Sequence, residues 1–250
     1  MANLEKPHAA FYVVGTPIGN LEDITLRALR IFKEVDLVLC EDTRVTKRLF
    51  DRHAITTPMM SYHAHSTLSK IDIIIAMLEE GKKIALVSDA GTPGISDPGS
   101  LLVEKIREHF SGENRLATDG VTGEMSEKIK IESVPGPSAL TAALSIAGVP
   151  IHEFTFLGFL PHKKGRETLF KEIAASERAV VFYESPHRIE KALQSLVEHL
   201  AEMPERTVVV ARELTKIFEE VVRGTPKEIA EYFEKNQDKI RGEFVVIVGR

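Results

Sequence analysis

The stretch V-S-D-A-G-T-P-G-I-S-D-P-G, residues 87–99, decides the fold of this chain. The apolar run Lys83–Val87 leads into it and predicts a buried strand. The apolar residues after it predict a helix with Asp97 as N-cap and Pro98 as its first residue. Its glycines permit positive φ and let a ligand approach the backbone. Thirteen residues are more than a plain connection needs, so we interpret the loop as a ligand site at the carboxyl end of a strand, with Asp89 at the tip.

The composition describes an ordinary globular protein. The 250 residues, 43% of them hydrophobic and 28% charged, can build one large domain or two small ones. The single Cys40 excludes a disulfide framework, so we expect a reducing, cytoplasmic location. The run Phe11–Val14 is too short for a signal peptide or a membrane span, and we expect no membrane association. A net charge of −5 gives no general attraction to nucleic acid, so RNA contact requires a local basic patch.

Short apolar strands alternate with segments of helical period, which predicts α/β architecture with a parallel, doubly wound sheet. The interruption Pro135-Gly136-Pro137 predicts a boundary between an N-terminal α/β domain, residues 1–134, and a C-terminal α/β domain, residues 135–250. The polar segment 111–127 is expected to be a surface excursion that lengthens a loop. We expect strands at residues 10–14, 36–40, 59–62, 83–87, 128–134, 154–159, 179–183, 207–211, 218–223 and 244–248.

Several familiar site motifs are absent from the sequence. No G-x-x-x-x-G-K-[ST] is present and no G-x-G-x-x-G follows the first strand, which argues against a P-loop and against a dinucleotide fold of that type. No G-x-S-x-G supports a nucleophile elbow. His63 and His65 lack a further ligand at the usual spacing, so no metal is expected. What remains is a set of glycine-rich loops at strand ends, which would line one ligand cleft if the two sheets face each other.

These loops resemble, in sequence and in order, those of the ribosomal RNA small subunit methyltransferase I family, within the tetrapyrrole methylase superfamily. The matching stretches are G-T-P-I-G-N at 15–20, E-D-T-R at 41–44, residues 88–99, V-P-G-P-S-A-L at 134–140, F-Y-E-S-P-H-R at 182–188 and A-R-E-L-T-K at 211–216. The resemblance implies two α/β domains of the tetrapyrrole-methylase type with S-adenosylmethionine in a cleft between them, and a homodimer. It also implies 2′-O-methylation of a cytidine ribose in the decoding region of small-subunit ribosomal RNA.

The resemblance further implies which residues contact the cofactor. The first loop would border the methionine moiety and the sulfonium, the second would hold the cofactor through backbone and carboxylate contacts, and two residues of the second domain would face the adenine. By position these are Thr16, Pro17 and Ile18 in the first loop; Asp89, Ala90, Gly91, Thr92 and Ile95 in the second; Ser138 and Ala139 at the domain junction; and Tyr183 and Leu214 in the second domain.

Methyl transfer from a sulfonium is an in-line displacement, so positioning the ribose hydroxyl can supply much of the catalysis, while a base removes its proton. Glu184 is the preferred base, with Asp42, His187 and Glu213 as alternatives; each can instead cap a turn or pair with a neighbouring arginine. Phosphates of naked ribosomal RNA or of the 30S particle would be held by basic loop residues, unless these are only solvated charges. These residues are Lys163, Lys164, Arg166, Arg188 and Lys216.

Two other functions stay open. A methyltransferase of the same fold that acts on a porphyrin-like small molecule would need a roomy apolar cleft floor and no phosphate track. A non-catalytic, ribosome-associated binder would give no heat when titrated with S-adenosylmethionine. Composition and spacing alone indicate only a two-domain α/β protein with a small-ligand cleft.

Overall fold

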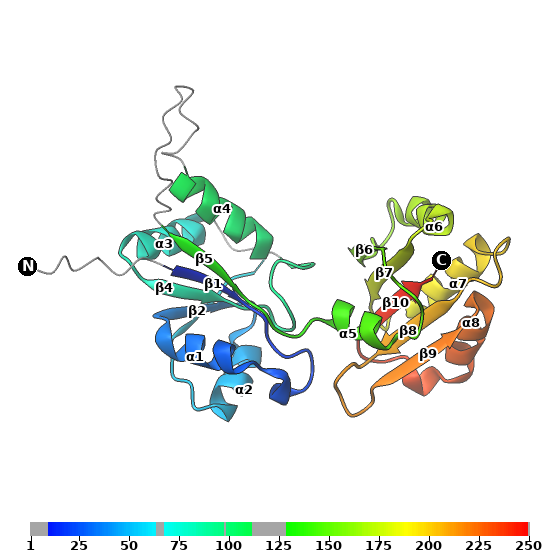
Figure 1. Ribbon diagram of the computed structural model, residues 1–250, viewed down its shortest axis with the longest axis horizontal. Helices are drawn as coiled ribbons and strands as arrows, with labels where there is room; N and C mark the ends of the chain where they lie inside the picture. The colour runs from blue at the N-terminus through cyan, green and yellow to red at the C-terminus, as the bar shows by residue number, and fades with distance from the viewer. Residues whose placement is uncertain (1–9, 64–67, 98, 112–128, 250) are drawn as a thin grey trace, which may run out of the picture. The chain divides into compact units, whose positions relative to one another are not determined.

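The computed structural model describes residues 10–63, 68–97, 99–111 and 129–249. The chain divides into two compact units, Met1–Ser138 and Ala139–Arg250 (Figure 1). Residues 135–138 stay with the first unit, where the Thr92 hydroxyl donates to the Pro137 carbonyl over 3.3 Å. Pro98 and the excursion after Ser111 lie outside the described residues, and so does His65.

The first unit is built on a parallel sheet with strand order β3-β2-β4-β1-β5. The strands are β1 (Ala10–Val14), β2 (Leu37–Cys40), β3 (Met59–Ser61), β4 (Lys83–Leu86) and β5 (Lys130–Val134). The interior strand β2, which lies between β3 and β4, is buried along its whole length, as its uninterrupted apolar sequence requires. Each of the four connections between these strands crosses over, so that the next strand runs in the same direction as the one before. The carboxyl ends of all five strands therefore lie at one edge of the sheet.

Helices cover both faces of this sheet (Figure 1). On one face α1 (Leu26–Glu34) and α2 (Thr43–Arg52) follow the short 3₁₀ helix η1 (Leu21–Asp23); on the other lie α3 (Leu68–Glu79) and α4 (Gly99–Ser111). Three apolar residues of α3 at helical spacing, Ile71, Ile74 and Leu78, are buried against the sheet, whereas Leu68 and Ile73 are exposed. The Asp97 carboxylate accepts the Gly99 N–H over 2.7 Å and so caps the start of α4, as the sequence predicts.

The second unit contains a mixed sheet with order β6-β7-β10-β8-β9. Its strands are β6 (Phe154–Phe159), β7 (Ala179–Glu184), β8 (Val208–Arg212), β9 (Glu220–Gly224) and β10 (Phe244–Val248). Only β6 and β7 pair in parallel; β8 and β9 form an antiparallel pair with no helix between them. The expected parallel arrangement therefore holds for the first sheet and not for the second.

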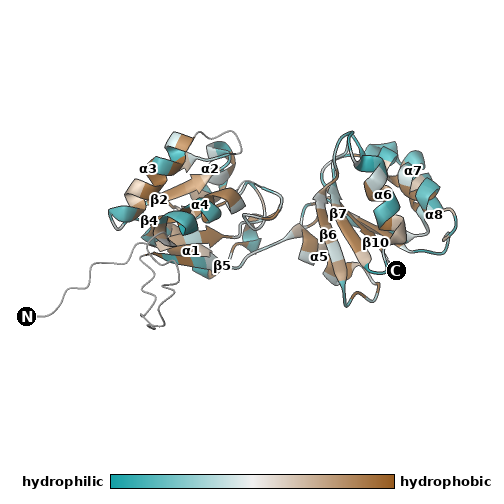
Figure 2. Cartoon of the chain, turned by 90° about the horizontal axis from the view of Figure 1, so that it is seen from above, coloured by the Kyte–Doolittle hydropathy of each residue, from teal (hydrophilic) through white to brown (hydrophobic). Residues whose placement is uncertain are grey.

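The helices of the second unit are α5 (Ala139–Ile146), α6 (Arg166–Ala175), α7 (Ile189–His199) and α8 (Pro226–Lys235), followed by η2 (Gln237–Lys239). Hydrophobic strands lie against helices whose outer faces are hydrophilic (Figure 2). Phe182, Phe233 and Phe244 lie fully buried in this core. Thr225 and Glu228 form a reciprocal capping box at the start of α8.

Candidate functional site

The candidate site lies at the carboxyl edge of the first sheet, where the loops after β1 and β4 are joined by their backbones. Thr16 and Gly91 exchange two hydrogen bonds: the Thr16 N–H donates to the Gly91 carbonyl over 2.9 Å, and the Gly91 N–H donates back over 3.1 Å. The buried Thr16 hydroxyl also donates to the Ser88 carbonyl over 3.2 Å. Gly91 has φ 81°, a conformation that favours glycine, so its type is fixed by this pairing.

The loop after β5 joins the same framework through two glycines. The Gly15 N–H donates to the Val134 carbonyl over 3.0 Å, and the Gly15 and Gly136 backbones touch. A Cβ added at Gly136 would lie 2.6 Å from the Gly15 carbonyl oxygen, and one at Gly15 would lie 2.7 Å from the Gly136 Cα. Neither position accepts a side chain unless the two loops separate.

The sequence-predicted residues of these loops fall into an inner and an outer group. Thr16, Pro17, Ile18 and Gly91 are buried and form the framework itself, and Thr92 is half-buried. Asp89 and Ala90 are exposed, and Ile95 exposes 46% of its surface although it is apolar. The outer group therefore presents a carboxylate and an apolar side chain above a rigid floor of backbone.

Acidic side chains from two neighbouring strand ends meet at this edge. One Asp89 oxygen accepts the Asp42 N–H over 3.0 Å, and the Asp89 N–H lies 3.4 Å from the Glu41 carboxylate. Burial raises the pKa of Glu41, and the charge of Asp89 adds to that rise. Hydrogen bonds from the Arg44 side chain and backbone lower the pKa of Asp42 to about 2. The edge is suited to a ligand that carries cationic and hydroxyl groups.

Two of the predicted cofactor contacts, Tyr183 and Leu214, lie in the second unit. The Tyr183 hydroxyl accepts the Leu140 N–H over 3.2 Å at the start of α5, and the Tyr183 ring packs against Phe156 and Phe159. Leu214 is buried between Glu213 at φ 51° and Thr215 at φ 66°, which are left-handed conformations rarely adopted by such residues. Backbone strain of this kind concentrates at ligand sites.

Ser138 ends the first unit and Ala139 begins the second, and both are half-buried. The expected cleft between the two halves stays a prediction. The same holds for the grouping of Tyr183 and Leu214 with the residues of the first unit.

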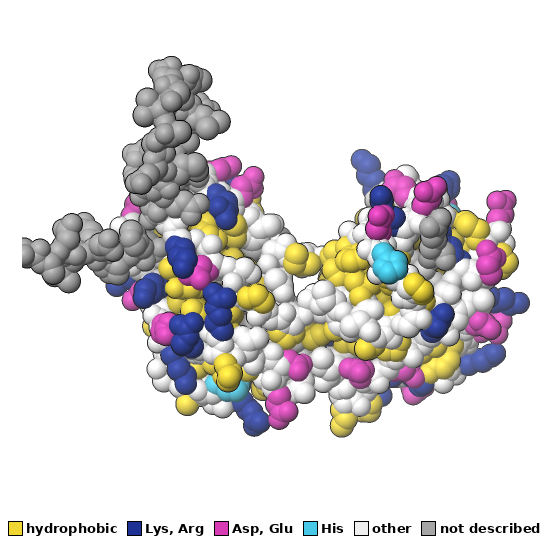
Figure 3. Space-filling model, in the orientation of Figure 1, with side chains coloured by type: hydrophobic (Ala, Val, Ile, Leu, Met, Phe, Trp, Pro, Cys, Tyr) yellow, Lys and Arg dark blue, Asp and Glu magenta, His cyan; other side chains and the backbone are white. Residues whose placement is uncertain are grey.

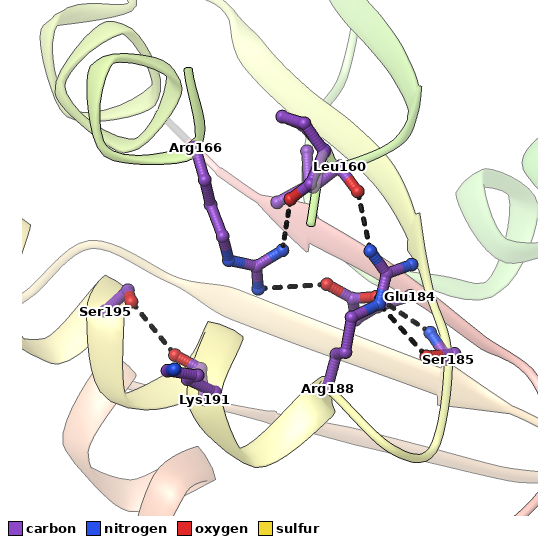
Figure 4. A network of polar contacts seen from close by, with 8 residues as sticks. Leu160, Arg166, Glu184, Ser185, Arg188, Lys191 and Ser195 are labelled. Carbon is purple, nitrogen blue, oxygen red and sulfur yellow. Dashed lines mark hydrogen bonds and ion pairs between the residues drawn. The ribbon is translucent and has the colours of Figure 1, made fainter. Parts of the chain in front are cut away.

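Glu184 lies in a network of polar contacts within the second unit (Figure 4). Its carboxylate is fully buried and pairs with the Arg166 guanidinium at 3.0 Å and the Arg188 guanidinium at 2.9 Å. It also accepts the Ser185 N–H over 2.9 Å. Arg166 and Arg188 reach further, to the carbonyls of Pro161 and Leu160. This geometry makes Glu184 an organiser of the loops around it, since both of its oxygens are engaged by guanidiniums from two different elements.

The other candidate bases differ in their surroundings. Glu213 pairs with Lys216 at 2.8 Å, and Asp42 pairs with Arg44 at 2.6 Å. His187 is exposed in the loop between β7 and α7, and no ion pair engages it within the part of the chain that the structure describes. His187 is therefore the candidate whose side chain is available without breaking an ion pair.

The predicted RNA-binding residues separate in the same way. Lys163 and Lys164 are exposed before α6, whereas Arg166 and Arg188 are largely buried with Glu184. Lys216 is held by Glu213 and, at 3.4 Å, by Glu243. Only the two lysines of this set point freely to solvent.

Sequence reasoning did not single out Gly15, Gly136 or Glu41, which the structure shows to shape the edge. The available signal was a glycine within two residues of the end of each strand, in G-T-P after β1 and in P-G-P after β5. Within the described residues no three His, Cys, Asp or Glu side chains are grouped as a metal site requires. No helix of the described chain has the length and apolarity that a membrane crossing demands.

Comparison with known proteins places this geometry in context. The family model for tetrapyrrole (corrin/porphyrin) methylases matches residues 10–230. The chain is 43% identical over 236 residues to a protein of Thermotoga maritima named ribosomal RNA small subunit methyltransferase I, covering 94% of this chain and 96% of that one. It is 44% identical over 248 residues to a protein of the same name from Leptospira biflexa, covering 98% and 92%.

Solved structures share the fold at lower identity. The cobalamin biosynthetic enzyme cobalt precorrin-4 methyltransferase superposes with a TM-score of 0.65 at 19% identity, over 98% of this chain and 96% of that one. Uroporphyrin-III C-methyltransferase of Thermus thermophilus, complexed with S-adenosyl homocysteine, superposes with a TM-score of 0.60 at 18% identity, over 96% and 97%.

Proposed function

The chain belongs to the tetrapyrrole (corrin/porphyrin) methylases, and we propose that within this family it is an S-adenosylmethionine-dependent methyltransferase of small-subunit ribosomal RNA. The observation that carries the proposal is identity above 40% along nearly the whole chain to proteins with that name. Likeness to the two corrin and porphyrin enzymes named above is 19% and 18% identity and concerns the fold alone. This contrast favours RNA over a porphyrin-like small molecule.

The residues at the carboxyl edge of the first sheet fit the cofactor. S-adenosylmethionine carries a cationic sulfonium, an ammonium and ribose hydroxyls, all of which suit a carboxylate. Asp89 uses one oxygen for the Asp42 N–H, and its other oxygen accepts no hydrogen bond from the described residues. Asp89, Ala90 and Ile95 would hold the cofactor above the floor made by Thr16 and Gly91.

When bound, the cofactor supplies an electrophilic methyl group on a good leaving group. The protein then has to hold a ribose hydroxyl in line with that methyl group, so its main catalytic contribution is to position the reactants. The backbone floor serves this purpose because the paired hydrogen bonds between Thr16 and Gly91 hold it in place. His187 would take the hydroxyl proton, since the other candidate bases are committed to ion pairs.

The finer identity of the substrate follows the family resemblance. The methylated group is the 2′-hydroxyl of a cytidine ribose in the decoding region, presented by naked RNA or by the 30S particle. The protein works as a homodimer in the cytoplasm. Lys163 and Lys164 would contact phosphates from the second unit.

The proposal is tested in two steps. Titration calorimetry with S-adenosylmethionine must give binding heat, and its absence would leave the non-catalytic binder as the correct function. Ribose methylation is then mapped on small-subunit RNA from cells with and without this protein. We expect one cytidine to lose its 2′-O-methyl group in the deleted strain, and an unchanged map would contradict the proposal.

A further inference from the structure

The outer side of α1 and α2, here named the α1–α2 surface, is the most basic helical surface of the described chain. The two helices carry seven lysines and arginines against two acidic residues, Glu34 and Asp51. Every other described α-helix has a net charge of zero or −1. In a chain of net charge −5 this local excess is a feature of one surface. Lys and Arg side chains gather on the part of the first unit where α1 and α2 lie (Figures 1 and 3).

The two helices form one continuous surface because they pack side by side on the same face of the sheet. The rings of Phe32 and Phe50 lie 5.3 Å apart between them, and Ile31 and Leu49 are buried in the same core. The basic side chains therefore face outward. Along α2 they follow helical spacing at residues 44, 48 and 52, which places three arginines in a row with a rise of about 6 Å from each to the next.

Three basic side chains of this surface are unpaired among the described residues, and the other four form ion pairs, which include Arg27 with Glu132 and Arg44 with Asp42. Arg30 and Lys47 pair with exposed carboxylates of their own helices at 3.0 and 2.7 Å, and such surface pairs contribute little energy. Lys33, Arg48 and Arg52 are exposed and have no acidic partner among the described residues. A phosphate backbone can replace the weak pairs and satisfy the unpaired charges together.

The row of arginines also runs up to the candidate cofactor edge. Helix α2 begins directly after Asp42, whose N–H binds Asp89 over 3.0 Å. We propose that the α1–α2 surface binds the phosphate backbone of the RNA substrate and leads it to the site at the end of β4. The inference rests on the proposed function for its partner, and it adds a surface that the predicted track in the second unit does not include.

The decisive variant is the double substitution Arg48→Gln and Arg52→Gln. Glutamine has nearly the helix propensity of arginine, so α2 keeps its stability and only charge is lost. The control is Lys227→Gln with Lys235→Gln, which removes the same charge from two exposed positions of α8 that have no proposed RNA contact. Binding to purified small-subunit ribosomal RNA is measured as a function of salt, and S-adenosylmethionine binding is measured by calorimetry.

We expect the double variant on α2 to bind RNA about ten-fold more weakly or worse at low salt, and to lower the slope of log affinity against log salt by about two. Cofactor affinity is expected to stay unchanged. An unchanged slope and affinity would overturn the inference, as would an absence of RNA binding by the unaltered protein. Weaker binding to assembled small subunits with unchanged binding to naked RNA would also overturn it, because the surface would then face a ribosomal protein.

The two proposals fail in distinguishable ways. If the unaltered protein transfers no methyl group but the α2 variant still loses RNA affinity, the surface stands and the proposed activity falls. If methyl transfer occurs and the α2 variant binds RNA normally, the activity stands and the surface falls.

Discussion

The contact between Gly15 and Gly136 gives the sharpest test of the framework beneath the candidate site. In Gly136→Ala the new Cβ would lie 2.6 Å from the Gly15 oxygen, whereas ordinary contacts begin at 3.4 Å. The two backbones must therefore separate by about 0.8 Å, and overpacking of this kind costs about 1–3 kcal/mol of unfolding free energy. Neither glycine has positive φ, so no backbone strain contributes to that cost.

The same displacement affects the ligand, because a shift of about 1 Å in a binding framework can cost roughly a hundred-fold in activity. Unfolding in urea is followed by circular dichroism, since the sequence contains no tryptophan, and S-adenosylmethionine affinity is measured by calorimetry. Gly165→Ala is the matched control: it has φ 83° and nothing within 4 Å of its added Cβ, so it costs stability in the second unit without touching the framework.

We expect Gly136→Ala to lose both stability and cofactor affinity, and Gly165→Ala to lose stability alone. Adding Gly15→Ala to Gly136→Ala should cost less than the sum of the two single changes, because the first Cβ already separates the loops. The reasoning is refuted if Gly136→Ala keeps its unfolding free energy within about 0.5 kcal/mol and binds cofactor normally.

Three further predictions concern charged groups. Asp89→Asn keeps an acceptor for the Asp42 N–H but loses its charge, so calorimetry should show on the order of ten-fold weaker cofactor binding at unchanged thermal stability; equal affinity would exclude a charged contact. Glu184→Gln leaves two buried guanidiniums without their anion and should lower the unfolding free energy by about 3 kcal/mol; lost turnover at unchanged stability would instead make Glu184 the base. Burial raises the pKa of Glu220, but hydrogen bonds from Lys239, Tyr232 and Arg212 outweigh it and bring it to about 2. Because this folded-state pKa is depressed, the stabilisation is present above the ordinary pKa of 4.5 and is lost as pH falls towards 2. The stability gap between the unaltered protein and Glu220→Gln should therefore narrow from pH 5 downward in urea unfolding, and a constant gap would contradict the assignment.

Sequence pattern predicted the strands well because their signal is local. Each of the ten expected strands is present, and no strand end is shifted by more than two residues. The bounds of β1, β6 and β10 agree fully with the expected ones. The exception concerns pairing direction in the second sheet. Alternation of strands and helices predicts parallel pairing, but the segment between β8 and β9 holds exposed Ile217 and Phe218 and no helix, so these strands turn back on each other.

The site was predictable only in outline. The loops at strand ends could be predicted from glycines and from family resemblance, because both are read from consecutive residues of the sequence. The contacts that decide each side chain's role join distant residues: Gly15 meets Gly136, and Glu184 meets Arg166 across 18 positions. Such contacts depend on sheet register and rotamer, which no spacing rule encodes. For this reason the sequence indicates that Glu184 lies at a strand end but not that it pairs with Arg166 and Arg188.

Asp42 contacts two different parts of the candidate site, one through its side chain and one through its backbone. Its side chain caps α2 and holds Arg44, while its backbone N–H fixes the carboxylate of Asp89. A polyanion that shifts the first turn of α2 therefore also moves the donor on which Asp89 depends. Thermodynamic linkage makes such coupling mutual. Bound cofactor would change the affinity for the polyanion by the same factor as bound polyanion changes the affinity for the cofactor, so the total binding free energy would not depend on which of them binds first.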